Sequence, residues 1–412
     1  MLNIAILGHG VVGSGVAEML FENKDIIKNS VGQEVRLKKV LDILDFKDLQ
    51  YSEIFTKNFD EILNDDEISI VVETIGGLIP SYEYVKSLLK RKKSVVSSNK
   101  ELVAKKGQEI LKIAKENNVS FLFEASVGGG MPILRPLVNY FTSNNVLSVL
   151  GILNGTTNFI LTKMEEENVS FEEALKLAQS LGYAEKDPSD DINGTDCVRK
   201  ISIICSLILK KHILSDEIFR AGIENISIED VIFAKNNGFV IRLIAKADFI
   251  DEKVNVMVFP AMLKSSNKLA FVDGVLNGAI VKTKEIGEVL FLGAGAGKFP
   301  TASAVLTDVV EIAKAVNKST NLVLYVAEKN TVLDYKKNKN MFYFRFEVKD
   351  FKLAKNFIVK HYNSPVFLNR EKSSSFELAF TTDFMFEEEV LKLEEKLKFY
   401  SLEKKAMFRI LC

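Results

Sequence analysis

Short apolar runs alternate with amphipathic helical patterns through the first third of the chain. Five apolar runs predict strands, at Leu2–Leu7, Val35–Leu41, Ile68–Val72, Ser94–Ser97 and Val119–Phe123. Apolar residues at helical spacing fall between these runs, at Val12–Phe21 and Tyr82–Arg91. Such alternation is typical of βαβ units around a parallel sheet, so we expect an α/β fold with a Rossmann-type domain over residues 1–135.

The pattern changes at about residue 136, where mixed strands and helices predict an α+β domain over residues 136–300. Strands are expected at Val146–Leu153, Gly238–Asp248, Val254–Pro260, Ala279–Val281 and Val289–Leu292, and helices at Phe159–Glu167, Phe171–Ser180 and Thr195–Lys210. A further helix, Thr301–Val316 within the segment 301–318, is expected to pack back on the first domain.

Residues 333–412 have a pattern of their own. Strands are predicted at Met341–Val348, Pro365–Arg370, Phe376–Thr382 and Lys405–Leu411, and helices at Phe351–His361 and Phe386–Phe399. The order βαββαβ in a segment of this length predicts a ferredoxin-like module.

Composition narrows the class of protein. The 412 residues are 47% hydrophobic and 26% charged, as in an ordinary globular protein, and 54 basic against 55 acidic residues leave a net charge of −1. We therefore expect no nucleic-acid or membrane partner. The longest nearly apolar run, Ile201–Leu209, is far shorter than the roughly 20 residues of a membrane span. Three cysteines without a C-x-x-C motif fit a reducing cytoplasm.

The motif "ILGHGVVG" places Gly8, Gly10 and Gly13 in G-x-G-x-x-G spacing between a strand and a helix. That context predicts a dinucleotide site, in which glycines allow the tight turn and the approach of the pyrophosphate to the helix start. An acidic residue that closes the second strand would bind the adenosine ribose. Asp42 and Asp45 are the candidates, and the absence of arginine between Val40 and Lys47 favours NAD over NADP. Lys38 and Lys39 keep NADP open, and if the strand ends earlier the two acids are only surface charges.

Two further strand ends carry candidate residues. "VVETIGG" (71–77) places Thr74, Ile75 and Gly76 where an open α/β sheet binds its ligand, although an ordinary strand-end turn explains the motif equally well. "SSNKE" (97–101) places Lys100 at the same edge, where a lysine is usually only solvated.

The densest polar segment runs from Leu181 to Lys200 and contains five acidic residues. Asp196 and Lys200 stand four residues apart on a predicted helix and so share one face. A solvated acidic loop with a surface ion pair and an active-site lysine held by an acid are both consistent with this pattern.

Six motifs occur in the order found in homoserine dehydrogenases: "GHGVVGSGV", "SSNKE", "EASVGGGMPI", "GILNGTTNFIL", "LGYAEKDPSDDINGTDCVRK" and "GAGAGKFPTASAV". The chain resembles this family from about residue 2 to residue 318. The resemblance implies NAD- or NADP-dependent interconversion of L-homoserine and L-aspartate 4-semialdehyde in threonine, methionine and isoleucine biosynthesis. It also implies a cytoplasmic homodimer or homotetramer.

The resemblance further implies residue roles. Lys200 resembles the catalytic lysine and Lys100 a second lysine at the junction of cofactor and substrate, and we expect Asp196 to orient Lys200 or hold the substrate. The implied substrate-binding residues are Glu185, Asp191, Asp196, Tyr183, Asn154, Gly155 and Thr156. The implied cofactor-binding residues are Gly8, Gly10, Val11, Val12, Gly13, Asp42, Thr74, Ile75, Gly76, Lys100, Gly295 and Gly297. Glu124 and the backbone around Val127, Gly129 and Met131 resemble a site for a monovalent cation such as sodium.

The C-terminal module resembles the regulatory ACT domain of this family, but its usual "D-x-P-G-V-L-A" turn is reduced to "DFKLA" (350–354). Without the proline and glycine, we expect weak or no inhibition by threonine. A dimer-forming or vestigial module is an equally open interpretation.

Two other functions were weighed. A cysteine-dependent semialdehyde dehydrogenase needs an activated thiolate, usually with a histidine. Cys197 and Cys205 lie in or beside an apolar helix, and His9, His212 and His361 have the positions of structural or surface residues. A non-catalytic dinucleotide sensor is the second alternative, and the pair Lys100 and Lys200 argues against it.

Overall fold

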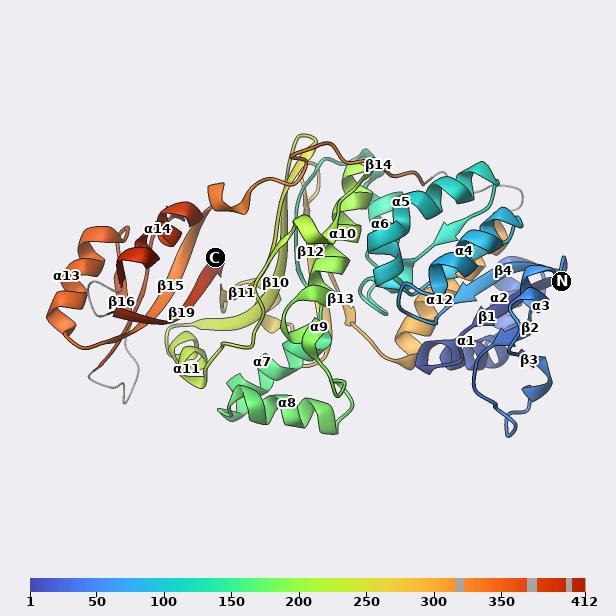
Figure 1. Ribbon diagram of the computed structural model, residues 1–412, viewed down its shortest axis with the longest axis horizontal. Coiled ribbons are helices and arrows are strands. Elements are labelled where there is room, and N and C mark those ends of the chain that lie inside the picture. The colour runs from blue at the N-terminus through green and yellow to red at the C-terminus, as the bar shows by residue number, and fades with distance from the viewer. Residues whose placement is uncertain (316–321, 369–375, 398–401, 412) are drawn as a thin grey trace. The chain divides into compact units, whose positions relative to one another are not determined.

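The computed structural model describes residues 1–315, 322–368, 376–397 and 402–411 (Figure 1). The chain forms two compact units. The first comprises Met1–Asn145, Ser202–Ser215 and Gly293–Glu328, and the second Val146–Ile201, Asp216–Leu292 and Lys329–Cys412. The division into three domains stays a prediction.

The first unit is built on a six-stranded parallel sheet, which confirms the βαβ pattern of the sequence. Its strands are β1 (Leu2–Leu7), β2 (Val35–Leu41), β3 (Phe55–Thr56), β4 (Ile68–Glu73), β5 (Ser94–Ser97) and β6 (Phe121–Leu122). They lie in the order β3-β2-β1-β4-β5-β6. The order of the strands reverses between β1 and β4, and such a switch point opens a ligand crevice at the carboxyl ends of the strands.

Helices cover this sheet. They are α1 (Val11–Glu22), α2 (Lys24–Val31), α3 (Asp60–Leu63), α4 (Ser81–Lys90), α5 (Lys100–Glu116), α6 (Leu134–Asn139) and α12 (Lys298–Lys314), with 3-10 turns η1 (Ser52–Ile54), η2 (Glu124–Ser126) and η3 (Phe141–Ser143). A two-stranded pair, β8 (Lys211–His212) and β14 (Tyr325–Val326), completes the unit. Within the described ranges, no helix is both long and apolar enough to cross a membrane.

Helix α12 returns from far along the chain to pack beside α1 (Figure 1). Its buried residues Ala302 and Val305 belong to the same core cluster as Ile4 of β1 and Val16 of α1. A Cβ atom on Gly15 would lie 3.0 Å from the Lys298 carbonyl oxygen, so this glycine permits the close approach of the two helices. Residues 316–318 of the predicted helix lie outside the described residues.

The second unit contains a mixed sheet. Its first strands are β7 (Val146–Ile152), β9 (Phe219–Arg220), β10 (Phe239–Ile250), β11 (Lys253–Lys264), β12 (Leu276–Thr283) and β13 (Gly287–Ala294). Strands β12 and β10 flank β7 and are antiparallel to it. The helices are α7 (Gly155–Glu167), α8 (Phe171–Ser180), α9 (Ser189–Ile192), α10 (Thr195–Leu209), of which the part from Ser202 belongs to the first unit, and α11 (Ile228–Asn236), with η4 (Ser215–Glu217) and η5 (Lys268–Phe271).

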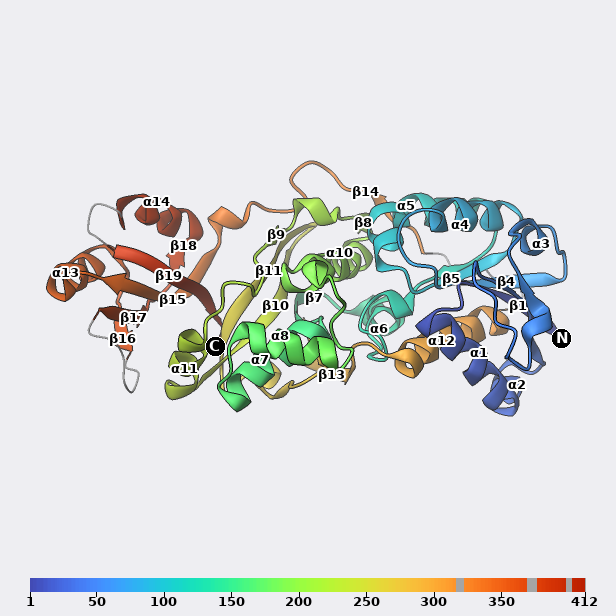
Figure 2. The same cartoon turned by 60° about the horizontal axis from the view of Figure 1, so that its bottom comes forward.

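The C-terminal residues extend the same sheet. The turn η6 (Tyr335–Lys337) leads into β15 (Lys339–Val348), α13 (Phe351–His361), β16 (Val366–Leu368), β17 (Glu377–Thr381), β18 (Met385–Phe386), α14 (Glu387–Leu397) and β19 (Leu402–Leu411), seen in Figure 2. The order β19-β15-β17-β16 with two crossover helices is that of a ferredoxin-like unit. Strand β19 also pairs in parallel with β11, so one sheet runs through both segments. Residues 369–370 and 398–399, which the sequence predicted as strand and helix, lie outside the described residues.

Candidate active site

The glycine loop between β1 and α1 has the shape of a pyrophosphate cradle. Gly8 has a φ of +91°, and a Cβ atom on Gly13 would lie 1.9 Å from the Gly8 carbonyl oxygen. At Gly10, in contrast, a Cβ atom would meet nothing within 4 Å. Two glycines are therefore required by the turn and its packing, while Gly10 leaves open space at the start of α1, beside Val11 and Val12. These features fit a dinucleotide phosphate at the amino end of the helix.

Thr74 holds this loop in place. Its hydroxyl donates hydrogen bonds to the carbonyl oxygens of Gly8 at 2.8 Å and Leu7 at 3.1 Å. The amides of Ile75 and Gly76 donate to the buried Glu73 carboxylate, at 3.0 and 3.3 Å. The motif after β4 is thus built around the loop after β1, which an ordinary strand-end turn would not require.

Sequence reasoning missed Glu73, whose carboxylate is fully buried and also accepts a hydrogen bond from the Ser97 hydroxyl at 2.6 Å. It therefore links the ends of β4 and β5. A carboxylate that closes an otherwise apolar strand was the available signal, because such a group is buried only when it is hydrogen-bonded.

Asp42 stands directly after β2 and contacts the glycine loop. Its Oδ2 accepts a hydrogen bond from the His9 amide at 2.6 Å, and its Oδ1 accepts one from the Leu44 amide at 2.9 Å. Asp45, the other acidic candidate, is exposed and pairs with Lys57 at 2.9 Å. The geometry favours Asp42 as the acidic group at the ribose position.

Lys100 is the first residue of α5, a 17-residue helix that was not predicted. Asn99 caps this helix by accepting a hydrogen bond from the Leu102 amide at 3.0 Å. Its side-chain amide also donates to the Gly77 carbonyl oxygen at 2.6 Å. Asn99 thereby fixes half-buried Lys100 relative to the "TIGG" turn.

The two glycine-rich segments 128–130 and 293–297 pack against each other. The Gly130 amide donates to the Ala294 carbonyl oxygen at 2.9 Å, and a Cβ atom on Gly129 would lie 2.5 Å from the Gly295 carbonyl oxygen. Gly297, with a φ of +122°, then caps α12. A side chain at Gly129 would separate these backbones.

Glu124 accepts hydrogen bonds from the backbone of the neighbouring turn. Its two carboxylate oxygens accept hydrogen bonds from the amides of Ile133, Leu134 and Arg135, at 2.8, 3.1 and 2.6 Å. Burial raises the pKa of Glu124, and the three amides oppose that shift. Val127 and Met131 are fully buried in the same turn. Among the described residues, no group of three or more His, Cys, Asp or Glu side chains is arranged to hold a metal ion.

The acid–lysine pair of α10 is buried. Lys200 Nζ lies 2.7 Å from Asp196 Oδ2 and donates to the Leu153 carbonyl oxygen at 2.7 Å. Asn154 donates from Nδ2 to Asp196 Oδ2 at 2.9 Å and to Asp191 Oδ1 at 2.7 Å. Asp196 and Lys200 are 1% and 8% exposed, which excludes the surface ion pair that the sequence left open.

The remaining candidates lie around the start of α7. Asn154 caps this helix, and the Thr156 hydroxyl donates to the Tyr183 carbonyl oxygen at 2.7 Å. Close packing requires glycine at position 155, because a Cβ atom on Gly155 would lie 2.8 Å from the Val275 carbonyl oxygen. Glu185 is exposed, close in sequence to Tyr183. The structure thus joins Asn154, Asp191, Asp196 and Lys200 by direct contacts and leaves the Glu185 carboxylate on the surface.

The two cysteines that the structure describes do not form a catalytic site. Cys197 and Cys205 are both fully buried, and burial raises the pKa of the Cys205 thiol well above its usual value. The His9 ring packs edge-on against Phe46, with centroids 4.6 Å apart. A thiolate nucleophile requires the opposite shift, so the cysteine-dependent alternative loses its support.

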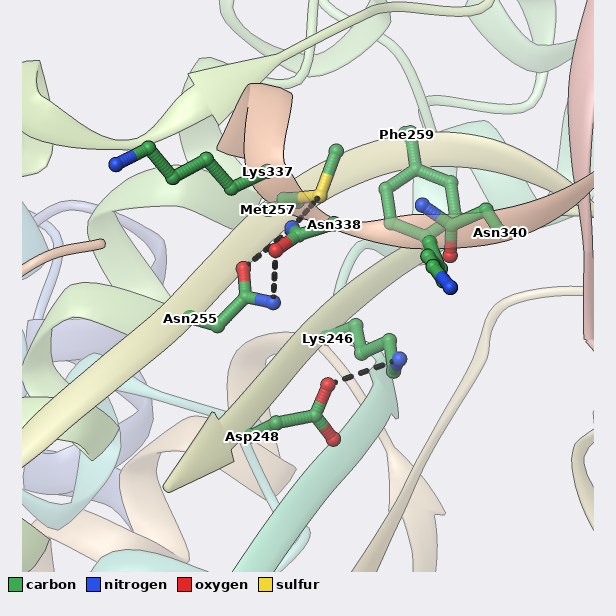
Figure 3. Close-up of a pocket in the computed structure, with 9 residues that line it drawn as sticks. Lys246, Asp248, Asn255, Met257, Phe259, Lys337, Asn338 and Asn340 are labelled. Atoms are coloured by element: carbon green, nitrogen blue, oxygen red, sulfur yellow. Dashed lines mark hydrogen bonds and ion pairs between the residues drawn. The ribbon is translucent and has the colours of Figure 1, made fainter. Parts of the chain in front are cut away.

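A cavity of about 220 Å³ lies away from these residues, between β10, β11 and the start of β15 (Figure 3). Asn255 and Asn338 exchange hydrogen bonds of 2.6 Å across it. Its cations do not converge: Lys246 pairs with Asp248 at 2.9 Å, and Lys337 extends away from the cavity. The cavity therefore offers no site for a charged ligand comparable to the Lys200 cluster.

Two family models match the chain. One, described as homoserine dehydrogenase, matches residues 132–310, and the other, described as the NAD binding domain of homoserine dehydrogenase, matches residues 8–124. A curated homoserine dehydrogenase from Lactococcus lactis is 40% identical over 319 residues, which are 76% of this chain and 74% of the relative.

Solved structures give the same result. The crystal structure of a homoserine dehydrogenase from Thiobacillus denitrificans superposes with a TM-score of 0.88 at 29% identity and covers 100% of this chain and 98% of that one. A hyperthermophilic archaeal homoserine dehydrogenase in complex with NADPH has a TM-score of 0.65 at 31% identity and covers 76% of this chain and 97% of its own.

Proposed function

Because this chain belongs to the homoserine dehydrogenase family, we propose that Lys200 is the acid–base group of its reaction. The enzyme is an NAD(P)-dependent oxidoreductase of amino-acid biosynthesis. Family membership implies L-homoserine and L-aspartate 4-semialdehyde as the substrate pair. The observation that carries the proposal is the burial of Lys200 with its ammonium held by Asp196 and the Leu153 carbonyl oxygen.

The nicotinamide cofactor, when bound, supplies the hydride for aldehyde reduction and accepts it in alcohol oxidation. Lys200 donates or accepts the proton of the reaction. In reduction its ammonium donates a proton to the oxygen of the aldehyde as that oxygen gains negative charge, and in oxidation the neutral amine accepts the hydroxyl proton. Asp196 orients the amine through the 2.7 Å contact. Such a group contributes typically about 10²–10⁴-fold to the rate.

The acidic residues near Lys200 suit the ammonium group of the amino-acid substrate. Asn154 Nδ2 holds both Asp191 and Asp196, which gives these carboxylates fixed directions. We assign to Glu185 the role of binding the ammonium group of homoserine, with Asp191 beside it. Thr156 fixes the backbone at Tyr183, two residues before Glu185, and thus limits where that carboxylate can lie.

The open space at Gly10 and the backbone amides of Val11 and Val12 would bind the pyrophosphate of the cofactor. Asp42 would take the adenosine ribose. A carboxylate repels a 2′-phosphate, so we assign NAD as the preferred cofactor of this chain. Lys100, at the start of α5, would act as the second lysine beside the substrate. Gly295 and Gly297 would border the cofactor through the turn that precedes α12.

Three further features belong to the proposal. Backbone carbonyl oxygens at Val127, Gly129 and Met131 would bind a monovalent cation such as sodium. Glu124 would shape that turn, since its carboxylate already accepts three amide hydrogen bonds. The enzyme would be a cytoplasmic homodimer or homotetramer. Its C-terminal segment would be a diverged ACT module, which the ferredoxin-like strand order supports.

Substrate analogues test the assignment of Glu185. Glu185→Gln should raise the KM for L-homoserine at least about tenfold and leave kcat within about threefold, because a charge-assisted hydrogen bond contributes roughly 1.5–3 kcal/mol. With 4-hydroxybutanoate, which lacks the ammonium group, wild type and variant should have nearly equal kcat/KM. Glu172→Gln, an exposed change on α8, is the control. An unchanged KM for homoserine would transfer the role to Asp191.

A further inference from the structure

The carbonyl group of Leu153 is the common acceptor of two buried side chains. It follows the last residue of β7, and Leu153 itself is fully buried. Lys200 Nζ donates to this oxygen at 2.7 Å, and Asn277 Nδ2 donates to it at 3.0 Å. Asn277 is fully buried on β12 and has no role in the assignments above.

We propose that Asn277 is a positioning residue that sets the direction of the Lys200 ammonium by fixing the carbonyl group to which it donates. The inference rests on the proposed role of Lys200. A lysine ammonium has three N–H groups. Asp196 and the Leu153 carbonyl oxygen receive two of them, so the third is directed by the positions of those two acceptors.

The register of the sheet explains why Asn277 can do this. Gly278 of β12 is paired with Ile152, the last residue of β7, which places Asn277 beside Leu153, the residue that follows the strand. Beyond β7 the ladder no longer fixes the backbone, and the chain turns into α7 within three residues. The Asn277 amide replaces the missing ladder hydrogen bond at Leu153. Without it, Lys200 is the remaining side chain of the described residues that donates to this carbonyl oxygen.

Orientation of this kind affects rate more than affinity. A shift of the amine by a fraction of an ångström changes its distance to the reacting oxygen, and proton transfer needs a heavy-atom separation of about 2.6–3.2 Å. The carboxylates assigned to the substrate ammonium have contacts of their own: Asp191 accepts from Asn154, and the position of Glu185 is limited by the Thr156 hydrogen bond at Tyr183. A change at Asn277 is therefore expected to lower kcat with little change in KM.

The chain contains a matched control in Asn158. It is buried to a similar degree, at 1% exposure, and donates to two backbone carbonyl oxygens, at Val272 before β12 (2.9 Å) and at Leu276, the first residue of β12 (3.2 Å). In both asparagines the Oδ1 atom is buried without a hydrogen-bond partner in the described residues. The two side chains thus differ chiefly in their acceptors, and only Asn277 shares its acceptor with Lys200.

The experiment compares Asn277→Leu, Asn158→Leu, Lys200→Ala and the double variant Lys200→Ala/Asn277→Leu in homoserine oxidation. Asn277→Leu should lower kcat roughly 10–100-fold, with the KM for homoserine within about threefold. Asn158→Leu should lose a similar amount of thermal stability but keep kcat within about threefold. The double variant should be no slower than Lys200→Ala, because Asn277 acts through the lysine. Asn277→Thr, whose side chain is too short to reach Leu153, serves if Asn277→Leu does not fold.

Three results would overturn the inference: a wild-type kcat in Asn277→Leu or Asn277→Thr, an equal loss of kcat in Asn158→Leu, or an additional loss in the double variant. The role of Lys200 fails separately, if Lys200→Ala alone keeps more than about a tenth of the wild-type kcat. An inactive Lys200→Ala together with an active Asn277→Leu would reject the positioning role and leave the acid–base assignment intact.

Discussion

Arg345 provides the sharpest test of how the C-terminal strands are attached. It lies on β15, and its guanidinium contacts both oxygens of Asp230 near the start of α11, at 2.7 and 3.1 Å. It also donates to the Ser227 hydroxyl at 2.8 Å and to Glu377 at 3.0 Å. Asp230 is fully buried and the Arg345 side chain is 10% exposed. Arg345→Met removes the cation and leaves the Asp230 carboxylate buried without it.

The size of the effect follows from that burial. Loss of one partner of a buried ion pair costs roughly 3–5 kcal/mol, because the remaining charge keeps its desolvation penalty. For a unit of more than 150 residues, each kcal/mol lowers the thermal midpoint by about 2–4 °C. The midpoint of Arg345→Met should therefore fall by roughly 6–20 °C. Tyr343, whose hydroxyl lies 3.1 Å from Asp230, offsets part of the loss by its hydrogen bond.

Differential scanning calorimetry of three variants separates the charge effect from lost packing. Asp230→Asn in the Arg345→Met background removes the uncompensated charge, so the double variant should recover at least about half of the lost midpoint. Lys24→Met breaks an exposed pair with Glu34 and should leave the midpoint nearly unchanged. A shift below about 2 °C in Arg345→Met, or no recovery in the double variant, would refute the reasoning.

Two further predictions concern regulation and pH. L-threonine at millimolar concentration should inhibit weakly or not at all, because only two residues separate β15 from α13 and the Asp350 carboxylate already caps α13, accepting a hydrogen bond from the Leu353 amide at 2.9 Å. Strong inhibition that is lost when residues from 333 onward are deleted would contradict this prediction. Burial raises the pKa of Asp308 to about 7 from its usual 3.8, although the ion-paired Arg135 opposes the shift, so between about pH 4 and pH 7 the folded state holds a proton there that the unfolded state releases. The stabilisation is present below that range and is lost as the pH rises through 7. In urea unfolding, the stability of wild type relative to Asp308→Asn should thus decrease by up to about 4 kcal/mol from pH 4 to pH 8, and a pH-independent difference would reject it.

Periodicity in the sequence was sufficient for most of the architecture. The predicted strands Leu2–Leu7, Val35–Leu41 and Ser94–Ser97 coincide with β1, β2 and β5, and the predicted helix Phe171–Ser180 coincides with α8. These elements are decided by burial of one face, which the apolar pattern reports directly. Helix α5 was missed although its buried residues Val103, Gly107, Ile110 and Ala114 lie at helical spacing and Asn99 caps it. Helix α7 begins four residues before its predicted start because Asn154 caps it.

The candidate site also contains residues that the sequence could predict and residues that it could not. The glycine motif and the spacing of Asp196 and Lys200 could be interpreted from sequence, since each depends on local geometry. Asn277 could not, because its partner is far away along the chain: it donates to a residue 124 positions away. No local pattern distinguishes a buried asparagine on a strand from an exposed one. Long-range hydrogen bonds of this kind require the fold.

Proton transfer by Lys200 can be tested directly in the chemical step. Stopped-flow absorbance of a single turnover of L-homoserine, with enzyme in excess over substrate and saturating cofactor, measures hydride transfer without product release. Lys200→Ala should slow this step by about 10²–10⁴-fold. Cofactor affinity, followed by NADH fluorescence titration, should remain within about threefold of wild type. A single-turnover rate above a tenth of the wild-type rate would contradict the assignment.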